Sequence, residues 1–218
     1  MHSQLPVSWF ALLVTLLLSA TVSGEANTHS VNALKKRWAE VNYQLEGKAR
    51  LAAFEQLVTD AENATADNPE MASAWIWSGI IKSSYAGAKG GLGALRLAKS
   101  AKSDLENALQ LDPEAMDGSA YTTLGTLYVS VPGWPLGFGD DKKGVQLLRQ
   151  ALMLNPNGID PNYFYADYLR KAKRYVEARD YLRKAQQASP RPDRPVADAG
   201  RQREISAALA AVEARLEH

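Results

Sequence analysis

Residues Gly118–Pro156, GSAYTTLGTLYVSVPGWPLGFGDDKKGVQLLRQALMLNP, carry the clearest pattern in this sequence of 218 residues. They predict a helix, a loop rich in proline and glycine, a second helix and a stop. In the second helix Gly144, Leu148 and Ala151 are spaced by four and then three residues, which places them on one helical stripe. Pro156 ends that helix because the residue before a proline is pushed out of helical backbone geometry.

The second half of this unit recurs along the chain. A small residue, a leucine and an alanine stand at the same spacing before a proline in three places: Ala101, Leu105 and Ala108 before Pro113; Gly144, Leu148 and Ala151 before Pro156; and Ala178, Leu182 and Ala185 before Pro190. A looser copy precedes Pro69. Each copy follows another amphipathic helix, best preserved as Tyr121, Leu124, Gly125 and Tyr128. Paired helices are therefore the repeating element of the chain.

This order of an aromatic residue, Leu-Gly, a tyrosine, the small-Leu-Ala phrase and a proline resembles the tetratricopeptide-repeat (TPR) family. The resemblance covers about residues 32–190. It implies an all-α, right-handed superhelix of antiparallel helix pairs, with about nine helices and a C-terminal capping helix. It also implies that the aromatic signature residues belong to the core: Trp75, Tyr121, Tyr128 and Tyr165.

Residues 1–26 differ in composition from the rest of the chain. Leu5–Leu18 is an uncharged apolar run that is too short to span a bilayer, and small residues follow it. We expect residues 1–26 to be a cleaved signal peptide, with an uncleaved anchor as the alternative. After cleavage no stable membrane span is expected, and we expect the protein to be exported to a bacterial periplasm.

The remaining chain divides at its proline stops. A capping helix pair with a turn at Gly47 is expected first, then three repeats, then a proline-rich connector and a last helix over Arg201–Leu216. The expected parts are 27–68 for the capping pair, 69–113, 114–156 and 157–190 for the repeats within 69–190, and 191–218 for the connector and cap.

Two repeats are longer than the roughly 34 residues of a regular TPR. The extra residues are expected as loops between paired helices, at 86–95 (AGAKGGLGAL) and at 131–141 (VPGWPLGFGDD). Inserts at equivalent places lie on one edge of a solenoid, which is often its binding edge.

Few residues could carry catalysis. Cysteine is absent, and the three histidines, His2, His29 and His218, stand at the ends of the chain. Serine, cysteine and zinc hydrolase mechanisms therefore lack a base or ligands, and no phosphate-binding or dinucleotide motif is present. Asp140 and Asp141 are expected to start a helix rather than to bind Ca²⁺. We expect no enzyme activity, no catalytic residue, no metal site and no cofactor; an enzyme using buried carboxylates is the alternative.

The inner groove of a TPR superhelix is lined by the first helix of each pair. On that face the sequence predicts seven contact residues: Ile76, Ile80, Thr122, Thr126, Tyr163, Asp167 and Arg170. In the second loop Trp134 and Phe138 stand where no helical stripe requires them. Such aromatic residues either anchor a partner or fold back and fill the gap between helix pairs, and the sequence leaves both roles open.

Charge is uneven along the chain although the net charge is only +1. Residues 104–168 are strongly acidic and residues 170–203 strongly basic. We expect neighbouring repeats to attract each other through these charges, with a basic surface for an acidic partner as the alternative.

These features together predict a non-enzymatic, extracytoplasmic scaffold that binds a protein or peptide through its groove and inserted loops. Nucleic acid is not expected as a partner, because the near-zero net charge provides no global attraction to it. The alternative is a small-ligand carrier. A loose resemblance to the TPR component of periplasmic TRAP-type transporters implies a cavity for a small hydrophobic ligand.

Overall fold

The computed structural model describes residues 30–217, so the expected signal peptide lies outside the described residues. Within this range nine helices and no strands are found, which confirms the predicted all-α architecture. The first helix covers residues 30–44 and the others are α2 (Gly47–Asp67), α3 (Ala72–Lys89), α4 (Gly91–Leu111), α5 (Ala115–Ser130), α6 (Asp141–Leu154), α7 (Ile159–Lys171), α8 (Tyr175–Gln187) and α9 (Pro195–Leu216). None of the helices in the described range is long and apolar enough to cross a membrane.

The second helix of each pair ends where the proline pattern predicts. α2, α4, α6 and α8 all stop two or three residues before their prolines. At Asp140 the predicted helix start is confirmed, because its carboxylate accepts a hydrogen bond from the Lys143 backbone N–H at 3.0 Å. α9 begins at Pro195, earlier than the predicted Arg201, since a proline is well tolerated in the first turn of a helix.

Small residues let the two helices of a pair approach closely. A Cβ built on Gly125 of α5 would lie 3.0 Å from the backbone oxygen of Gly144 in α6. In the preceding pair, a Cβ on Gly79 would lie 2.5 Å from the Leu105 side chain. Leu105 and Leu148 are fully buried as a result, and they occupy the leucine position of the repeated phrase.

Two expectations about buried and inserted residues need correction. Residues 86–95 do not form a loop: α3 continues to Lys89 and α4 starts at Gly91. The turn is made at Gly90 and Gly91, whose φ values of 65° and 62° suit residues without a side chain, so the extra residues lengthen the helices. Among the signature aromatics, Tyr128 and Tyr165 are buried, whereas Trp75 and Tyr121 are only half-buried.

A buried ionic cluster joins α3 to α4. Lys82 donates to Asp104 at 2.8 Å, and Ser78 donates to the same carboxylate oxygen at 2.7 Å. Glu62 of α2 lies 3.2 Å from the Lys82 ammonium group. Because Lys82 and Asp104 compensate each other's charge, both can stay buried, and the exposed Glu62 adds a contact from a third consecutive helix.

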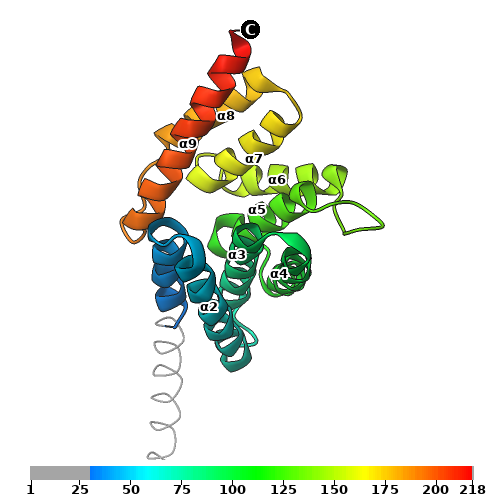
Figure 1. Ribbon diagram of the computed structural model, residues 1–218, viewed down its shortest axis with the longest axis vertical. Helices are drawn as coiled ribbons and strands as arrows, with labels where there is room; N and C mark the ends of the chain where they lie inside the picture. Colours follow the sequence, from blue (N-terminus) through cyan, green and yellow to red (C-terminus); the bar gives the residue numbers. More distant parts are fainter. Residues whose placement is uncertain (1–29, 218) are drawn as a thin grey trace, which may run out of the picture.

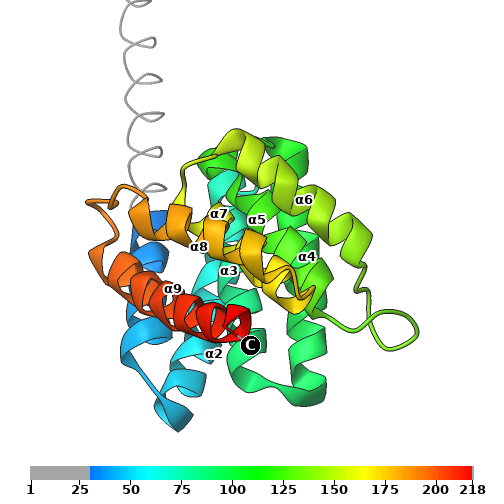
Figure 2. The ribbon, with the colours of Figure 1, turned by 90° about the horizontal axis from the view of Figure 1, so that it is seen from above.

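The first and last helices touch, so the array closes on itself. The connector before α9 lies against the helix of residues 30–44 (Figure 1), where Lys35 and Asp193 form an ion pair at 2.5 Å. Ala197 of α9 belongs to the same hydrophobic cluster as Val31 and Leu34. Seen from above, α9 lies beside α8 (Figure 2), and it also contacts α7. α9 is therefore both a cap and the element that closes the helices around a central space.

Candidate functional site: a central cavity

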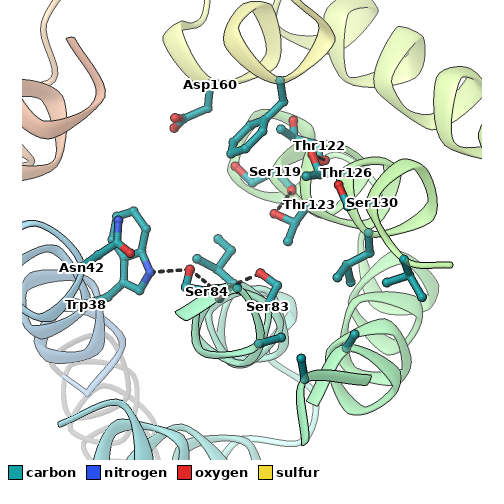
Figure 3. A pocket seen from close by; sticks show the side chains of 18 of the residues that line it. Trp38, Asn42, Ser83, Ser84, Ser119, Thr122, Thr123, Thr126, Ser130 and Asp160 are labelled. Carbon is teal, nitrogen blue, oxygen red and sulfur yellow. Dashed lines mark hydrogen bonds between the residues drawn. The ribbon is translucent and has the colours of Figure 1, made fainter. Parts of the chain in front are cut away.

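The closed array surrounds a cavity of about 620 Å³. Its walls come from the first helix of each pair, namely residues 30–44, α3, α5 and α7, together with α4, α9 and the loop before α6. Figure 3 shows Trp38 and Asn42 on one side and the hydroxyl residues of α5 on the other. The two long repeats meet here, because Leu95 of α4 lines the cavity beside Val131 and Pro132 of the loop.

Most of the wall is apolar, and its hydroxyl groups are already bonded to the protein. Ser84 Oγ and Thr126 Oγ1 each donate at 2.8 Å to a backbone carbonyl of their own helix. Thr123 and Ser119 do the same, at 3.0 and 2.7 Å. Ser84 also accepts from the indole N–H of Trp38 at 2.9 Å. The protons of these four hydroxyl groups are thus committed, and the oxygen lone pairs are what these four side chains offer to a ligand.

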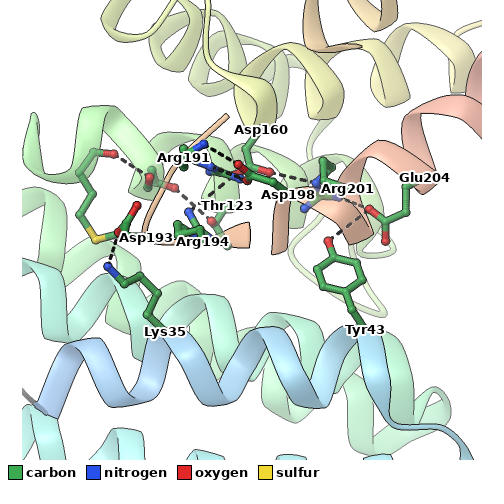
Figure 4. A network of polar contacts seen from close by, with 12 residues as sticks. Lys35, Tyr43, Thr123, Asp160, Arg191, Asp193, Arg194, Asp198, Arg201 and Glu204 are labelled. Atoms are coloured by element: carbon green, nitrogen blue, oxygen red, sulfur yellow. Dashed lines mark hydrogen bonds and ion pairs between the residues drawn. The ribbon is translucent and has the colours of Figure 1, made fainter. Parts of the chain in front are cut away.

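One end of the cavity is charged. Asp160 of α7 accepts hydrogen bonds from Arg191 at 2.7 Å and from Arg201 at 2.9 Å, and Arg194 lies 3.9 Å away (Figure 4). Burial raises the pKa of a carboxyl group, but the guanidinium groups of Arg201, Arg191 and Arg194 outweigh it and hold the pKa of Asp160 well below its usual range. Asp160 is therefore an ionised structural carboxylate and has no role as a proton donor at neutral pH.

The charged end is also part of the junction between the first and last helices. Arg201 binds Glu204 as well as Asp160, and the Tyr43 hydroxyl lies 3.5 Å from Glu204. Burial raises the pKa of Tyr43 to about 12, although the Arg201 charge opposes that shift. The Arg194 guanidinium lies over the rings of Trp38 and Trp77, at 5.8 and 5.2 Å. Charge and aromatic contacts together therefore fix this wall.

The structure brings only part of the predicted groove to the cavity. Ile80, Thr122 and Thr126 line it, whereas Ile76 is fully buried in the hydrophobic core. Ile76 packs instead in the hydrophobic cluster formed with buried residues of α4 and α5. The predicted contacts on α7 lie elsewhere, and their side chains are engaged by other residues: Tyr163 packs under the Arg201 guanidinium at 4.4 Å, and Asp167 pairs with Arg170 at 2.6 Å.

The two loop aromatics have different surroundings. Phe138 folds back onto Tyr128, with ring centroids 5.4 Å apart, and it packs against the core. Trp134 is 90% exposed at the tip of the loop, which projects from the body of the molecule (Figure 1). Phe138 therefore fills a gap between helices, and Trp134 is presented to the surroundings.

Most of the wall was not predicted from the sequence, including the four residues of its charged and aromatic end: Trp38, Asp160, Arg194 and Arg201. The opposite charges of residues 104–168 and 170–203 predicted attraction between neighbouring repeats. The ion pairs of Asp160 with Arg191 and Arg201 join these two segments. Nothing in the sequence indicated that these charges would face the same space as Trp38, because they come from opposite ends of the chain.

Comparison with known proteins supports the fold. No protein-family model and no curated protein matches the sequence. The crystal structure of TTC0263, a thermophilic TPR protein of Thermus thermophilus, is similar with a TM-score of 0.57 and 18% identity, over 91% of this chain and 96% of that chain. PilF of Pseudomonas aeruginosa is similar over 85% of this chain and 93% of its own at 17% identity, but with a TM-score of 0.34. On the likeness to TTC0263 and its own repeat pattern, the chain has a TPR-like, all-α superhelical fold.

Proposed function

We propose that the protein is a non-enzymatic, exported TPR-like binding protein that holds a small organic ligand in its central cavity. The observation that carries this proposal is the cavity itself. Its volume of about 620 Å³ lies within the roughly 300–1,000 Å³ typical of small-molecule sites. Such sites combine mainly apolar walls with a few oriented polar groups, and Trp38, Phe164 and the charged end of the cavity fit that description.

The closure of the array favours a compact ligand over an extended peptide. An open TPR superhelix offers a continuous groove along its inner face. Here the contact between residues 30–44 and the segment that leads into α9 joins the two ends of that groove, so the inner face becomes a hollow that is partly open to solvent. The role outside the cytoplasm rests on the apolar N-terminal run of residues 5–18 and the absence of cysteine.

Gly87→Trp is expected to abolish ligand binding, by at least about 100-fold in Kd. Gly87 lines the cavity, and a Cβ built on it meets nothing within 4 Å, so a large side chain has room to enter the space that a ligand would occupy. The measurement is isothermal titration calorimetry with ligands found by native mass spectrometry of the protein purified from its own cells.

Gly87→Ala is the matched control. It leaves the cavity open and should retain binding, while replacing a helical glycine raises stability by about 0.4–1 kcal/mol. Full-strength binding by Gly87→Trp would show that the ligand sits elsewhere and that the cavity is not the site.

A second candidate function is docking of a protein partner through the loop before α6. The specific observation is Trp134, which is 90% exposed on a rigid scaffold, where large aromatic side chains commonly act as binding anchors. The TPR-like fold is consistent with this role, since its members typically bind proteins.

Trp134→Ala is expected to remove the partner from crosslinked complexes while leaving the fold unchanged, because the side chain makes little contact with the rest of the protein. Recovery of each crosslinked protein from native cells is compared by quantitative mass spectrometry. Met153→Ala, which removes another exposed apolar side chain, is the control. If Trp134→Ala and Met153→Ala recover the same proteins in the same amounts as wild type, the loop is not an anchor.

A further inference from the structure

We propose that the cavity binds a monocarboxylate with an apolar body, and that the guanidinium group of Arg194 receives its carboxylate. This inference rests on the proposed small-ligand function and adds the chemical class of the ligand. The apolar walls would hold the body of the ligand, and the charged end of the cavity would hold its head.

Arg194 is the positively charged side chain of the cavity wall whose guanidinium makes no hydrogen bond within the described residues. Of its side-chain surface, 14% remains accessible. The nearest carboxylate oxygen, Oδ2 of Asp160, lies 3.9 Å from Nη1, beyond hydrogen-bonding distance. Because a hydrogen bond between a guanidinium group and a carboxylate is charge-assisted, an acceptor supplied by a ligand would be favourable at the Nη groups.

Asp160 does not hydrogen-bond Arg194, because its nearest oxygen lies 3.9 Å from the Arg194 guanidinium and both of its oxygens are turned toward other arginines. Arg191 donates to Oδ2 at 2.7 Å and Arg201 donates to Oδ1 at 2.9 Å. Arg201 has a second carboxylate in Glu204, and Arg191 has one in Asp198. Arg194 alone among these three guanidinium groups has no hydrogen-bonded carboxylate.

The charge of the wall selects an anion. The charged side chains that line the cavity are Asp160, Arg194 and Arg201, and of these Arg194 is the charge without a hydrogen-bonded partner. A cationic head group would be repelled by the Arg194 guanidinium, and a neutral hydroxyl would gain a weaker hydrogen bond than a carboxylate. The hydroxyl groups of Ser84 and Thr123 add no competing donors, because they bond to their own helices.

Arg194 is also held in position before any ligand arrives. Its guanidinium lies over Trp38 and Trp77, at 5.8 and 5.2 Å from the ring centroids. Stacking of this kind restrains the plane of the guanidinium and leaves its edge for two parallel hydrogen bonds to a carboxylate. Trp38 lines the cavity as well, so the apolar part of a ligand would contact the same ring.

The test compares three probes of one chain length, decanoate, decanol and decylammonium, by calorimetry on the delipidated protein. We expect decanoate to bind about 10- to 100-fold more tightly than decanol, since charge-assisted hydrogen bonds contribute more than neutral ones. Decylammonium should bind most weakly. Arg194→Gln should bring decanoate to the affinity of decanol, whereas Arg203→Gln, at an exposed position of α9, should change nothing.

The comparison of probes on wild-type protein tests the inference even if Arg194→Gln disturbs the junction. Equal binding of decanoate and decanol, both blocked by Gly87→Trp, would overturn the carboxylate inference and leave the small-ligand function standing. Binding of none of the three decyl probes, or binding that Gly87→Trp does not block, would overturn both the carboxylate inference and the small-ligand function.

A short apolar peptide, with a free or an amidated C-terminus, is a fourth probe in the same experiment. Preference for the free peptide without binding of decanoate would overturn the small-ligand function and would assign the site to the end of a protein chain.

Discussion

Asp160→Asn is expected to lower the free energy of unfolding by about 3–5 kcal/mol at pH 7. Removal of one partner from a buried ionic network leaves the opposite charges uncompensated, which is costly. Here one carboxylate serves Arg191 and Arg201 directly and lies near Arg194, and all three are at least partly buried. The loss should be measured by urea-induced unfolding followed by circular dichroism.

The effect of Asp160→Asn should depend on pH. The pKa of Asp160 in the folded protein is held below its usual range. Its contribution to stability is therefore fully present above the unfolded pKa of about 3.9 and is lost as pH falls through the folded value. The difference in stability between wild type and Asp160→Asn should be constant from pH 7 to about pH 5 and should narrow below about pH 4.

Asp193→Asn is the matched control, because Asp193 pairs with Lys35 but its side chain is 62% exposed. Such a pair typically contributes less than about 1 kcal/mol. If Asp160→Asn and Asp193→Asn destabilise the protein equally, or if the Asp160→Asn difference persists unchanged at pH 2, then Asp160 is not the centre of the junction.

Trp77→Ala is expected to destabilise the protein by about 3–5 kcal/mol, the range for truncating a large aromatic side chain in a core. Trp77 is 1% exposed, its ring meets that of Trp38 at 5.7 Å, and Arg194 lies over it. The substitution would therefore leave a cavity where three segments meet: the first helix, α3 and the connector before α9. Chemical unfolding should report the loss, and the thermal midpoint should fall with it.

Trp134→Ala removes the same side chain from the exposed loop and should change stability by less than about 0.5 kcal/mol. The comparison separates burial from any general effect of losing a tryptophan. A small effect of Trp77→Ala, similar to that of Trp134→Ala, would mean that the first helix and α9 are not held together at this point.

Local sequence patterns predicted the helices well because their causes are local. A proline alters the backbone within one residue on either side, so the ends of α4, α6 and α8 follow from Pro113, Pro156 and Pro190. Small residues spaced by four and three along a helix mark a close contact whatever the partner is, as Gly144 illustrates.

The errors arose where several local structures suit the same residues. The glycines of residues 86–95 are compatible with a loop or with two helices joined by one sharp turn. The packing of α3 against α4 favours the two helices. Ile76 and Ile80 are both apolar and four residues apart, yet only Ile80 reaches the cavity. Which side of a helix meets its neighbour depends on how the pairs stack, and the periodicity of one helix does not contain that information.

The sequence by itself determined that this protein is a chain of paired helices in a TPR-like array, since periodicity, prolines and small residues act over a few positions. Only the tertiary structure decided that the array closes and what faces its interior. Lys35 and Asp193 are 158 residues apart, and their contact depends on the summed rotation of every helix pair between them. The cavity, with Arg194 held over Trp38 and Trp77 at its charged end, exists only once that rotation has brought the first and last helices together.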